Sequence, residues 1–221
     1  MDMFPLYNSL RISAIATFIA LLTGVGAAYA VFKMPKVLKG IFDTILTIPM
    51  VLPPTVVGYF ILVWFSPKSF IGGKLLEYFD IVITMRWYAS VIVVSIIAFP
   101  FIYRTVRGAF ESLDNNIVNA GRTLGMSDFS VFVLVMLPNC KQGILAGTAL
   151  AFARGLGEYG ATSMVSGYIA GKTATVSTSV AYFWQINQQD KVMYWVLINL
   201  IISFIFMILL NIFNKEKRNR T

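Results

Sequence analysis

Five stretches of the sequence approach or reach the length that an apolar helix needs to cross a membrane, and this feature limits the possible folds most. They run over residues 12–32, 42–65, 88–103, 141–165 and 192–213. A membrane helix takes about 20 mostly apolar residues. Only 13% of the residues are charged, against about 25% in soluble domains. We therefore predict an all-α, polytopic membrane helix bundle with five transmembrane helices, forming a single domain over residues 1–221. We read stretch 12–32 as a retained span rather than a signal peptide, and we expect no further domain after the last span.

Prolines interrupt the second stretch at Pro49, Pro53 and Pro54. Proline removes a backbone donor and clashes with the carbonyl one turn back, so the helix should break near its middle. Freed backbone groups at membrane depth are tolerated only against protein or water. We therefore predict that residues 52–55, which include Thr55, lie on the inner side of the bundle; a packed kink is the alternative. The third stretch is short, and Arg104 at its end should snorkel to the interface.

The distribution of basic residues sets the orientation. With the N-terminus outside, the inner segments hold eleven lysines and arginines, namely Lys33, Lys36, Lys39, Arg104, Arg107, Arg122, Lys141, Lys215, Lys217, Arg218 and Arg220. The outer segments hold six, namely Arg11, Lys68, Lys74, Arg86, Lys172 and Lys191. Basic residues collect in cytoplasmic loops. The sequence therefore predicts an N-out, C-in arrangement with a cytoplasmic loop over residues 104–139.

The composition argues against catalysis and against nucleic-acid binding. The chain has no histidine and one cysteine, Cys140, which removes histidine metal sites and Ser-His or Cys-His nucleophile pairs. We predict no catalytic residue, no metal site and no cofactor. The net charge of +8 follows from the cytoplasmic loops, because no basic stripe or aromatic-basic module is present. An intramembrane enzyme would lack plausible machinery.

The cytoplasmic loop is too long for a simple connector and has its own helical pattern. Asp114 is a candidate N-cap, and Gly125 occupies the position of a C′ glycine. A second helix should begin at Ser127 and close at Leu137-Pro138. The first helix presents one small face, formed by Ile117, Ala120, Gly121 and Leu124. Such a face suits insertion into a groove on another protein, and an interfacial helix on the lipid headgroups is the equal alternative.

Part of this loop resembles the "EAA" loop of ABC importer permeases, which reads Glu-Ala-Ala, three residues, Gly, nine residues, Ile, one residue, Leu-Pro. The matching residues here run from Asn119 to Gly125 and from Val135 to Pro138. Asn119 replaces the family's Glu, Gly121 its second Ala and Val135 its Ile. The missing carboxylate puts in doubt any salt bridge that the family's Glu makes. The resemblance implies a type I ABC importer transmembrane domain whose ATPase-coupling residues are Asn119, Ala120, Gly121, Arg122, Leu124, Gly125, Leu137 and Pro138.

Three further segments, residues 49–59, 70–72 and 151–162, are similar to the molybdate branch of these permeases. The resemblance implies an importer of molybdate or tungstate in the cytoplasmic (inner) membrane of a bacterium or archaeon. It also implies a homodimer in contact with membrane lipid, a cytoplasmic ABC ATPase dimer and an extracytoplasmic oxyanion-binding protein. No phosphate-binding Gly-x-x-x-x-Gly-Lys-Ser/Thr motif occurs, in agreement with an ATPase on a separate chain.

Two rival functions stay open. Sulfate or thiosulfate permeases share the Phe-Ala-Arg-x-Leu-Gly-Glu pattern found near Arg154. The rival from another class is an ion-coupled secondary carrier. Such carriers usually show an internal repeat and midplane acidic relays, whereas here we find no repeat, and Glu158 is the only acidic residue deep in a span.

Arg154 and Glu158 are ionisable groups inside the fourth stretch, four residues apart on one helix face. A net-neutral pair is a poor site for a dianion, so we predict a packing or gating role. Thr162, Ser163 and Ser166 follow and could offer hydroxyls to an oxyanion. We therefore assign Pro53, Pro54, Thr55, Arg154, Glu158, Thr162 and Ser163 to the pathway or gate. The outer segments 66–86 and 167–190 are expected to receive the binding protein.

Overall fold

The computed structural model describes residues 2–218 and is helical throughout most of its length. The long helices are α1 (Phe4–Phe32), α2 (Lys36–Val51), α5 (Trp87–Glu111), α9 (Lys141–Leu156) and α12 (Gln189–Arg218). The shorter ones are α3 (Pro54–Phe65), α4 (Phe70–Phe79), α6 (Asn115–Thr123), α7 (Asp128–Val131), α8 (Leu137–Asn139), α10 (Gly160–Val165) and α11 (Val176–Gln185). A π-helical turn, η1 (Phe132–Met136), joins α7 to α8.

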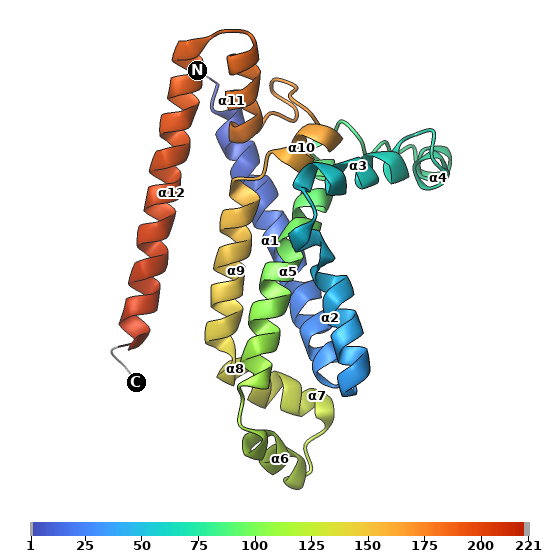
Figure 1. Cartoon of the computed structure of the whole chain (residues 1–221), viewed down its shortest axis with the longest axis vertical. Coiled ribbons are helices and arrows are strands. Elements are labelled where there is room, and N and C mark those ends of the chain that lie inside the picture. Colours follow the sequence, from blue (N-terminus) through green and yellow to red (C-terminus); the bar gives the residue numbers. More distant parts are fainter. Residues whose placement is uncertain (1, 219–221) are drawn as a thin grey trace.

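Within the described part of the chain, three helices are long and apolar enough to cross a membrane on their own: α1, α5 and the part of α12 up to Ile208. Two bent pairs, α2 with α3 and residues 128–139 with α9, raise the number to five if each pair is one span. The predicted all-helical membrane fold is thus confirmed. α1 begins and α12 ends at opposite ends of the molecule, and α6 to α8 lie at the same end as the end of α12 (Figure 1). This arrangement agrees with the predicted orientation.

Two of the predicted spans are not continuous helices. The second breaks between α2 and α3, where the axis turns by 101°. Leu52 and Pro53 are extended there, because Pro53 and Pro54 cannot supply the N–H groups that would continue α2. The predicted fourth span is wrong as one helix, since α9 ends at Leu156 and α10 begins at Gly160. Gly157 and Tyr159 flank this second break. Neither residue type interrupts a helix as clearly as a proline does, so the sequence does not predict the break.

The third predicted span is also too short. α5 runs to Glu111, eight residues beyond Tyr103, so Arg104 lies inside the helix rather than at its end. Packing explains the extension, because Val106 and Phe110 on the added turns are fully buried. The first and fifth predicted spans lie inside α1 and α12, which are both longer than predicted.

α5 is the centre of the bundle. It lies between α9 and α2, with α1 behind it (Figure 1). One apolar cluster surrounds its cytoplasmic half and includes Ile102, Val106 and Phe110. A second cluster surrounds its outer half and includes Val94 and Ile97. α12 stands apart from this core over most of its length (Figure 1), and only 6% of its apolar window is buried.

Candidate functional site

The two helix breaks meet inside the bundle. A Cβ placed on Gly160, the first residue of α10, would lie 3.1 Å from Thr55 Cγ2 and 3.4 Å from Pro54 Cβ. One turn further along α3, a Cβ on Gly58 would lie 2.8 Å from the Cα of Ala161. The structure therefore brings together the predicted residues Pro54 and Thr55 with the segment that follows Glu158. Broken helices at membrane depth are stable only where protein or water satisfies the backbone.

Glu158 joins the two sides of the second break. Its Oε1 accepts a hydrogen bond from the backbone N–H of Ala161 at 2.8 Å, and its Oε2 lies 2.6 Å from an Arg154 guanidinium nitrogen. The Glu158 side chain is 1% exposed and that of Arg154 is 31% exposed. The pair therefore exists as predicted, but it ties the end of α9 to the start of α10 instead of lying on one continuous helix.

The predicted hydroxyl groups lie just beyond this pair. The Thr162 hydroxyl is buried and donates to backbone carbonyls of residues 158 and 159, at 3.2 and 3.0 Å. Ser163 donates to the carbonyl of Gly160 at 2.9 Å. Ser166 lies 2.6 Å, hydroxyl to hydroxyl, from Ser90. In this conformation all three hydroxyls already have hydrogen-bond partners within the protein, and an oxyanion would have to redirect them.

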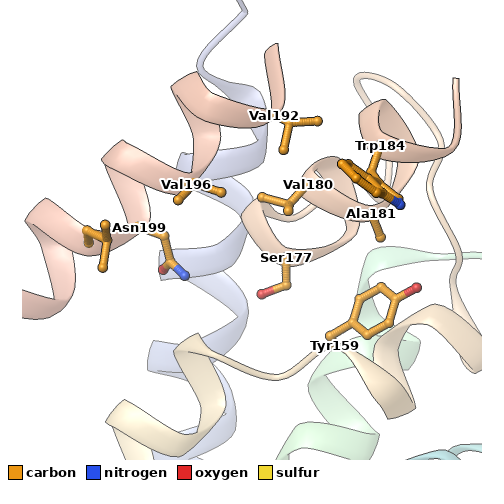
Figure 2. A pocket seen from close by; sticks show the side chains of 9 residues that line it. Tyr159, Ser177, Val180, Ala181, Trp184, Val192, Val196 and Asn199 are labelled. Carbon is orange, nitrogen blue, oxygen red and sulfur yellow. The ribbon is translucent and has the colours of Figure 1, made fainter. Parts of the chain in front are cut away.

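A hollow of about 550 Å³ lies beside the second break, between α11 and α12 (Figure 2). Tyr159 lines it, together with Ser177 and Trp184 of α11 and Asn199 of α12. The remaining lining residues are aliphatic, and none of the lining side chains carries a charge. An apolar, uncharged hollow gives a dianion no counter-charge, so this is a poor oxyanion site.

At the cytoplasmic end, α6 has the predicted caps. Asp114 accepts the N–H of Asn116 at 2.9 Å. Gly125 has a φ of +79°, and its N–H bonds to the Arg122 carbonyl while the N–H of Met126 bonds to that of Gly121, as in a Schellman motif. Ser127 caps the next helix through the N–H of Ser130. The caps of the loop are therefore as the sequence predicts, but the second helix does not close at Leu137-Pro138, because η1 and α8 continue it to Asn139.

The orientation of α6 differs from the prediction in one respect. Gly121 faces inward, where an added Cβ would lie 3.3 Å from Val131 Cγ2, and Val118 is buried beside it. Ile117 and Leu124 are 43% and 82% exposed. Sequence reasoning missed Phe129, which is 73% exposed on α7. The outward apolar residues of α6 and α7 and the turn between them are thus Ile117, Ala120, Leu124 and Phe129, and Leu134 of η1 is exposed as well.

Asp128 anchors the loop, a role that the sequence alone does not indicate. Its carboxylate lies 2.9 Å from Lys33 Nζ at the end of α1 and 3.2 Å from the Arg122 guanidinium. The Tyr29 hydroxyl donates to the Asp128 carbonyl at 3.1 Å. The hydrogen bond with Lys33 holds the pKa of Asp128 below its usual value. Hydrogen bonds with Tyr29 and Asp128 raise the pKa of Lys33.

Pro138 explains the π-helical turn that precedes it. A proline ring clashes with the carbonyl four residues back, here that of Leu134, and offers no N–H to it. The chain widens into η1, with the N–H of Leu137 bonding to the carbonyl of Phe132. The Asn139 side chain donates to the Val135 carbonyl at 2.7 Å. Leu137 and Pro138 thus lie where the loop joins α9, and not in the exposed turn between α6 and α7.

A second ionic cluster, also missed, holds α2 against α5. Asp43 on α2 pairs with Arg107 and accepts the hydroxyl of Tyr103. Lys39 on α2 pairs with Glu111, which lies 3.2 Å from Arg107. α2 has no fully buried residue. Polar contacts therefore make up much of its attachment to the bundle.

These features define a class of protein. Broken helices that meet within a helical membrane bundle, together with a capped helical loop at the cytoplasmic end, are features of transport permeases. Residues 20–219 match the family described as "Binding-protein-dependent transport system inner membrane component". The chain belongs to this family: it is an ABC importer permease subunit and a multi-pass protein of the cytoplasmic membrane.

Individual members of the family give a more specific comparison. The chain is 37% identical over 172 residues to the molybdenum transport system permease protein ModB of Escherichia coli K12, covering 78% of this chain and 75% of that one. It is 32% identical to the putative molybdenum transport system permease protein YvgM of Bacillus subtilis, covering 92% and 89%. The sulfate transport system permease protein CysT of Salmonella typhimurium is 34% identical over 69% of this chain and 54% of its own length.

Solved structures share the fold. A bacterial alginate ABC transporter chain matches with a TM-score of 0.75 at 12% identity, covering 97% of this chain and 79% of that one. A chain of the MetNI methionine ABC transporter matches with a TM-score of 0.71 at 13% identity, covering 92% and 90%. Because these identities are low, the matches support the architecture alone and do not indicate a substrate.

Proposed function

We propose that this chain forms the membrane pathway of an ATP-driven importer of molybdate or tungstate. The observation that carries the proposal is the similarity to two molybdenum permeases, at 37% and 32% identity over most of both chains. The helical loop at the cytoplasmic end supports an ATP-driven mechanism, because a secondary carrier has no need of a docking loop. ATP hydrolysis takes place on a separate chain.

In the proposed complex, two copies of the chain form the pathway and two ATPase subunits bind at the cytoplasmic end. The surface of Ile117, Ala120, Leu124 and Phe129 is the docking surface on each copy. It is apolar, exposed and held in place by Asp128, which suits insertion into a groove of a protein partner. The extracytoplasmic binding protein docks at the other end, on segments 66–86 and 167–190, which contain α4 and α11.

The meeting point of the two helix breaks is the proposed gate region. Pro53, Pro54 and Thr55 form one side, and the Arg154–Glu158 pair with α10 forms the other. Both breaks, between α2 and α3 and between α9 and α10, give the chain places to bend, and the buried pair holds the second of them in its present geometry. In this proposal the pair holds the gate rather than the anion, since its charges already neutralise each other.

One experiment tests the proposal. The permease, its ATPase and its binding protein are reconstituted in proteoliposomes, and ATP hydrolysis is measured with binding protein loaded with molybdate, tungstate or sulfate. Stimulation by molybdate or tungstate supports the proposal. Stimulation by sulfate alone would favour the sulfate permeases, which are 34% identical over 69% of this chain. Gradient-driven uptake by the purified chain without ATP would favour a secondary carrier.

A further inference from the structure

Arg104 is an exposed arginine on a helix that is otherwise almost enclosed. In the inner half of α5, its neighbours Ile102, Tyr103 and Val106 are fully buried. Its guanidinium contacts the sulfur of Met50, at 4.0 Å. Among the side chains that the structure describes, up to residue 208, no carboxylate lies within ion-pair distance of Arg104, whereas the neighbouring cations Lys39 and Arg107 are both paired. Arg104 is therefore the one basic residue of this cluster whose charge is not neutralised.

The surroundings of α5 show where Arg104 points. α9 approaches the side of Thr105 and Ala109, through close contacts with Gly147 and Gly143. α2 covers the side of Tyr103 and Arg107, where Asp43 binds. At about 100° per residue, the uncovered stripe between these two sides contains positions 104 and 108. A Cβ on Gly108 would meet nothing within 4 Å, which confirms that the stripe is open. We call it the α5 groove.

The depth of Arg104 decides what the groove can face. It lies 17 residues after Trp87, or about 25 Å along a helix, within a hydrocarbon core of about 30 Å. Helical side chains tilt towards the N-terminus of their helix, and the contact with Met50 shows that the guanidinium points towards the α2–α3 break. Arg104 therefore does not snorkel to the cytoplasmic surface, contrary to the prediction from sequence. Because the guanidinium points towards Met50 and away from the nearby cytoplasmic surface, its unpaired charge would be costly in lipid, and we infer that the groove faces water or protein.

We propose that Arg104 is an oxyanion-binding residue in the inner half of the transport pathway, for a tetrahedral dianion of the molybdate class. The inference rests on the proposed function and adds a residue that contacts the transported anion, which the proposed function does not name. A guanidinium stays charged at every relevant pH and offers a fork of donors that fits oxyanions. One exposed cation binds a passing anion weakly, as conduction requires. Two copies of the chain would supply two such residues for two negative charges.

Uptake by the reconstituted complex tests the residue. Arg104→Gln should lower the rate of molybdate uptake at least about tenfold, the scale expected for the loss of a hydrogen bond to a charged group. Arg104→Lys should retain most of the rate because it keeps the charge. The matched control Lys36→Gln removes an exposed, unpaired positive charge from the same cytoplasmic half and should leave uptake unchanged. Co-purification of the ATPase and unchanged basal hydrolysis show that Arg104→Gln still assembles.

Labelling tests the direction of the groove without relying on the uptake rate. Position 108 lies 21 residues after Trp87, or about 32 Å along the helix, so it can meet water at the inner membrane surface and labelling alone decides nothing. In a Cys140→Ala background, molybdate should slow the reaction of Gly108→Cys with a small hydrophilic thiol reagent. Phe18→Cys, on the exposed face of α1 at mid-helix, should not react. If molybdate leaves the labelling of Gly108→Cys unchanged in an active complex, or if Arg104→Gln transports at the normal rate, the Arg104 proposal is overturned. A wild-type complex that no oxyanion-loaded binding protein stimulates would instead overturn the proposed function.

Discussion

Gly58 of α3 packs directly on the backbone of Ala161 of α10. A Cβ at position 58 would lie 2.8 Å from the Ala161 Cα, 2.9 Å from its carbonyl oxygen and 3.0 Å from Met164 Cβ. Backbone atoms cannot move aside as a flexible side chain can. The close approach therefore fixes how the two short helices cross, and with it how the two helix breaks meet.

Gly58→Ala should destabilise the protein, because the added methyl group forces α3 away from α10. Overpacking of this kind costs about 1–3 kcal/mol. The control is Gly26→Ala on α1, where an added Cβ meets nothing within 4 Å. Removing a glycine from a helix interior should stabilise this variant by about 0.5–1 kcal/mol. Thermal unfolding in detergent, followed by tryptophan fluorescence, measures both; equal midpoints for the two variants would contradict the prediction.

Gly125→Arg should uncouple ATP hydrolysis from uptake. The position has a φ of +79°, which costs a side chain about 1–2 kcal/mol, and the new charge would stand beside the apolar docking surface. Gly125→Asn is the matched variant, since asparagine tolerates this backbone conformation, and it should keep coupling close to normal. The measurement is the ratio of ATP hydrolysed to molybdate taken up. Coupled uptake by Gly125→Arg would show that the docking surface is assigned wrongly.

The sequence predicts local structure well wherever one residue type determines it. Pro53 and Pro54 predict a break because proline lacks the donor, and Gly125 predicts a helix end because glycine adopts a left-handed conformation. The break at residues 157–159 has no such residue, since glycine is common in helices that pack closely in membranes. Two contacts stabilise it instead: the Glu158 carboxylate accepts the N–H of Ala161 locally, and α10 packs closely on α3 at Gly58.

In the candidate site, too, the sequence predicts local features and misses those that depend on contacts between helices. The spacing from Asn119 to Pro138 predicts the docking loop, but not that Gly121 turns inward, because that depends on Val131 across the loop. Asp128, Asp43 and Arg104 were missed as site residues for a common reason. The role of Asp128 and Asp43 depends on a charge partner on a different helix, and the role of Arg104 depends on the absence of such a partner. A single sequence contains no information on such pairs beyond their charge.

Removing one partner of the Arg154–Glu158 pair should have unequal effects on stability. Arg154→Gln leaves the Glu158 carboxylate, which is 1% exposed, without its counter-charge, and we expect a loss of about 3–5 kcal/mol. Glu158→Gln leaves an arginine that is 31% exposed and can reach water, and the new amide oxygen can still accept the N–H of Ala161. The loss of stability in Glu158→Gln should be smaller, about 1 kcal/mol. Unfolding midpoints of the two single variants and the double variant provide the test, and equal losses would show that burial does not decide the effect.

Asp43 and Arg107 should show strong energetic coupling, because few apolar contacts hold α2 in place. Both side chains are only about a fifth exposed, and Asp43 also accepts the hydroxyl of Tyr103. A double-mutant cycle of Asp43→Asn and Arg107→Gln should give a coupling of about 1–3 kcal/mol, as expected for contacting residues in one network. The matched cycle on the Lys33–Asp128 pair, whose side chains are 37% and 58% exposed, should give a smaller value because water screens its charges. If the two cycles give the same coupling, partial burial does not strengthen the Asp43–Arg107 pair, and this ionic cluster is not what holds α2 against α5.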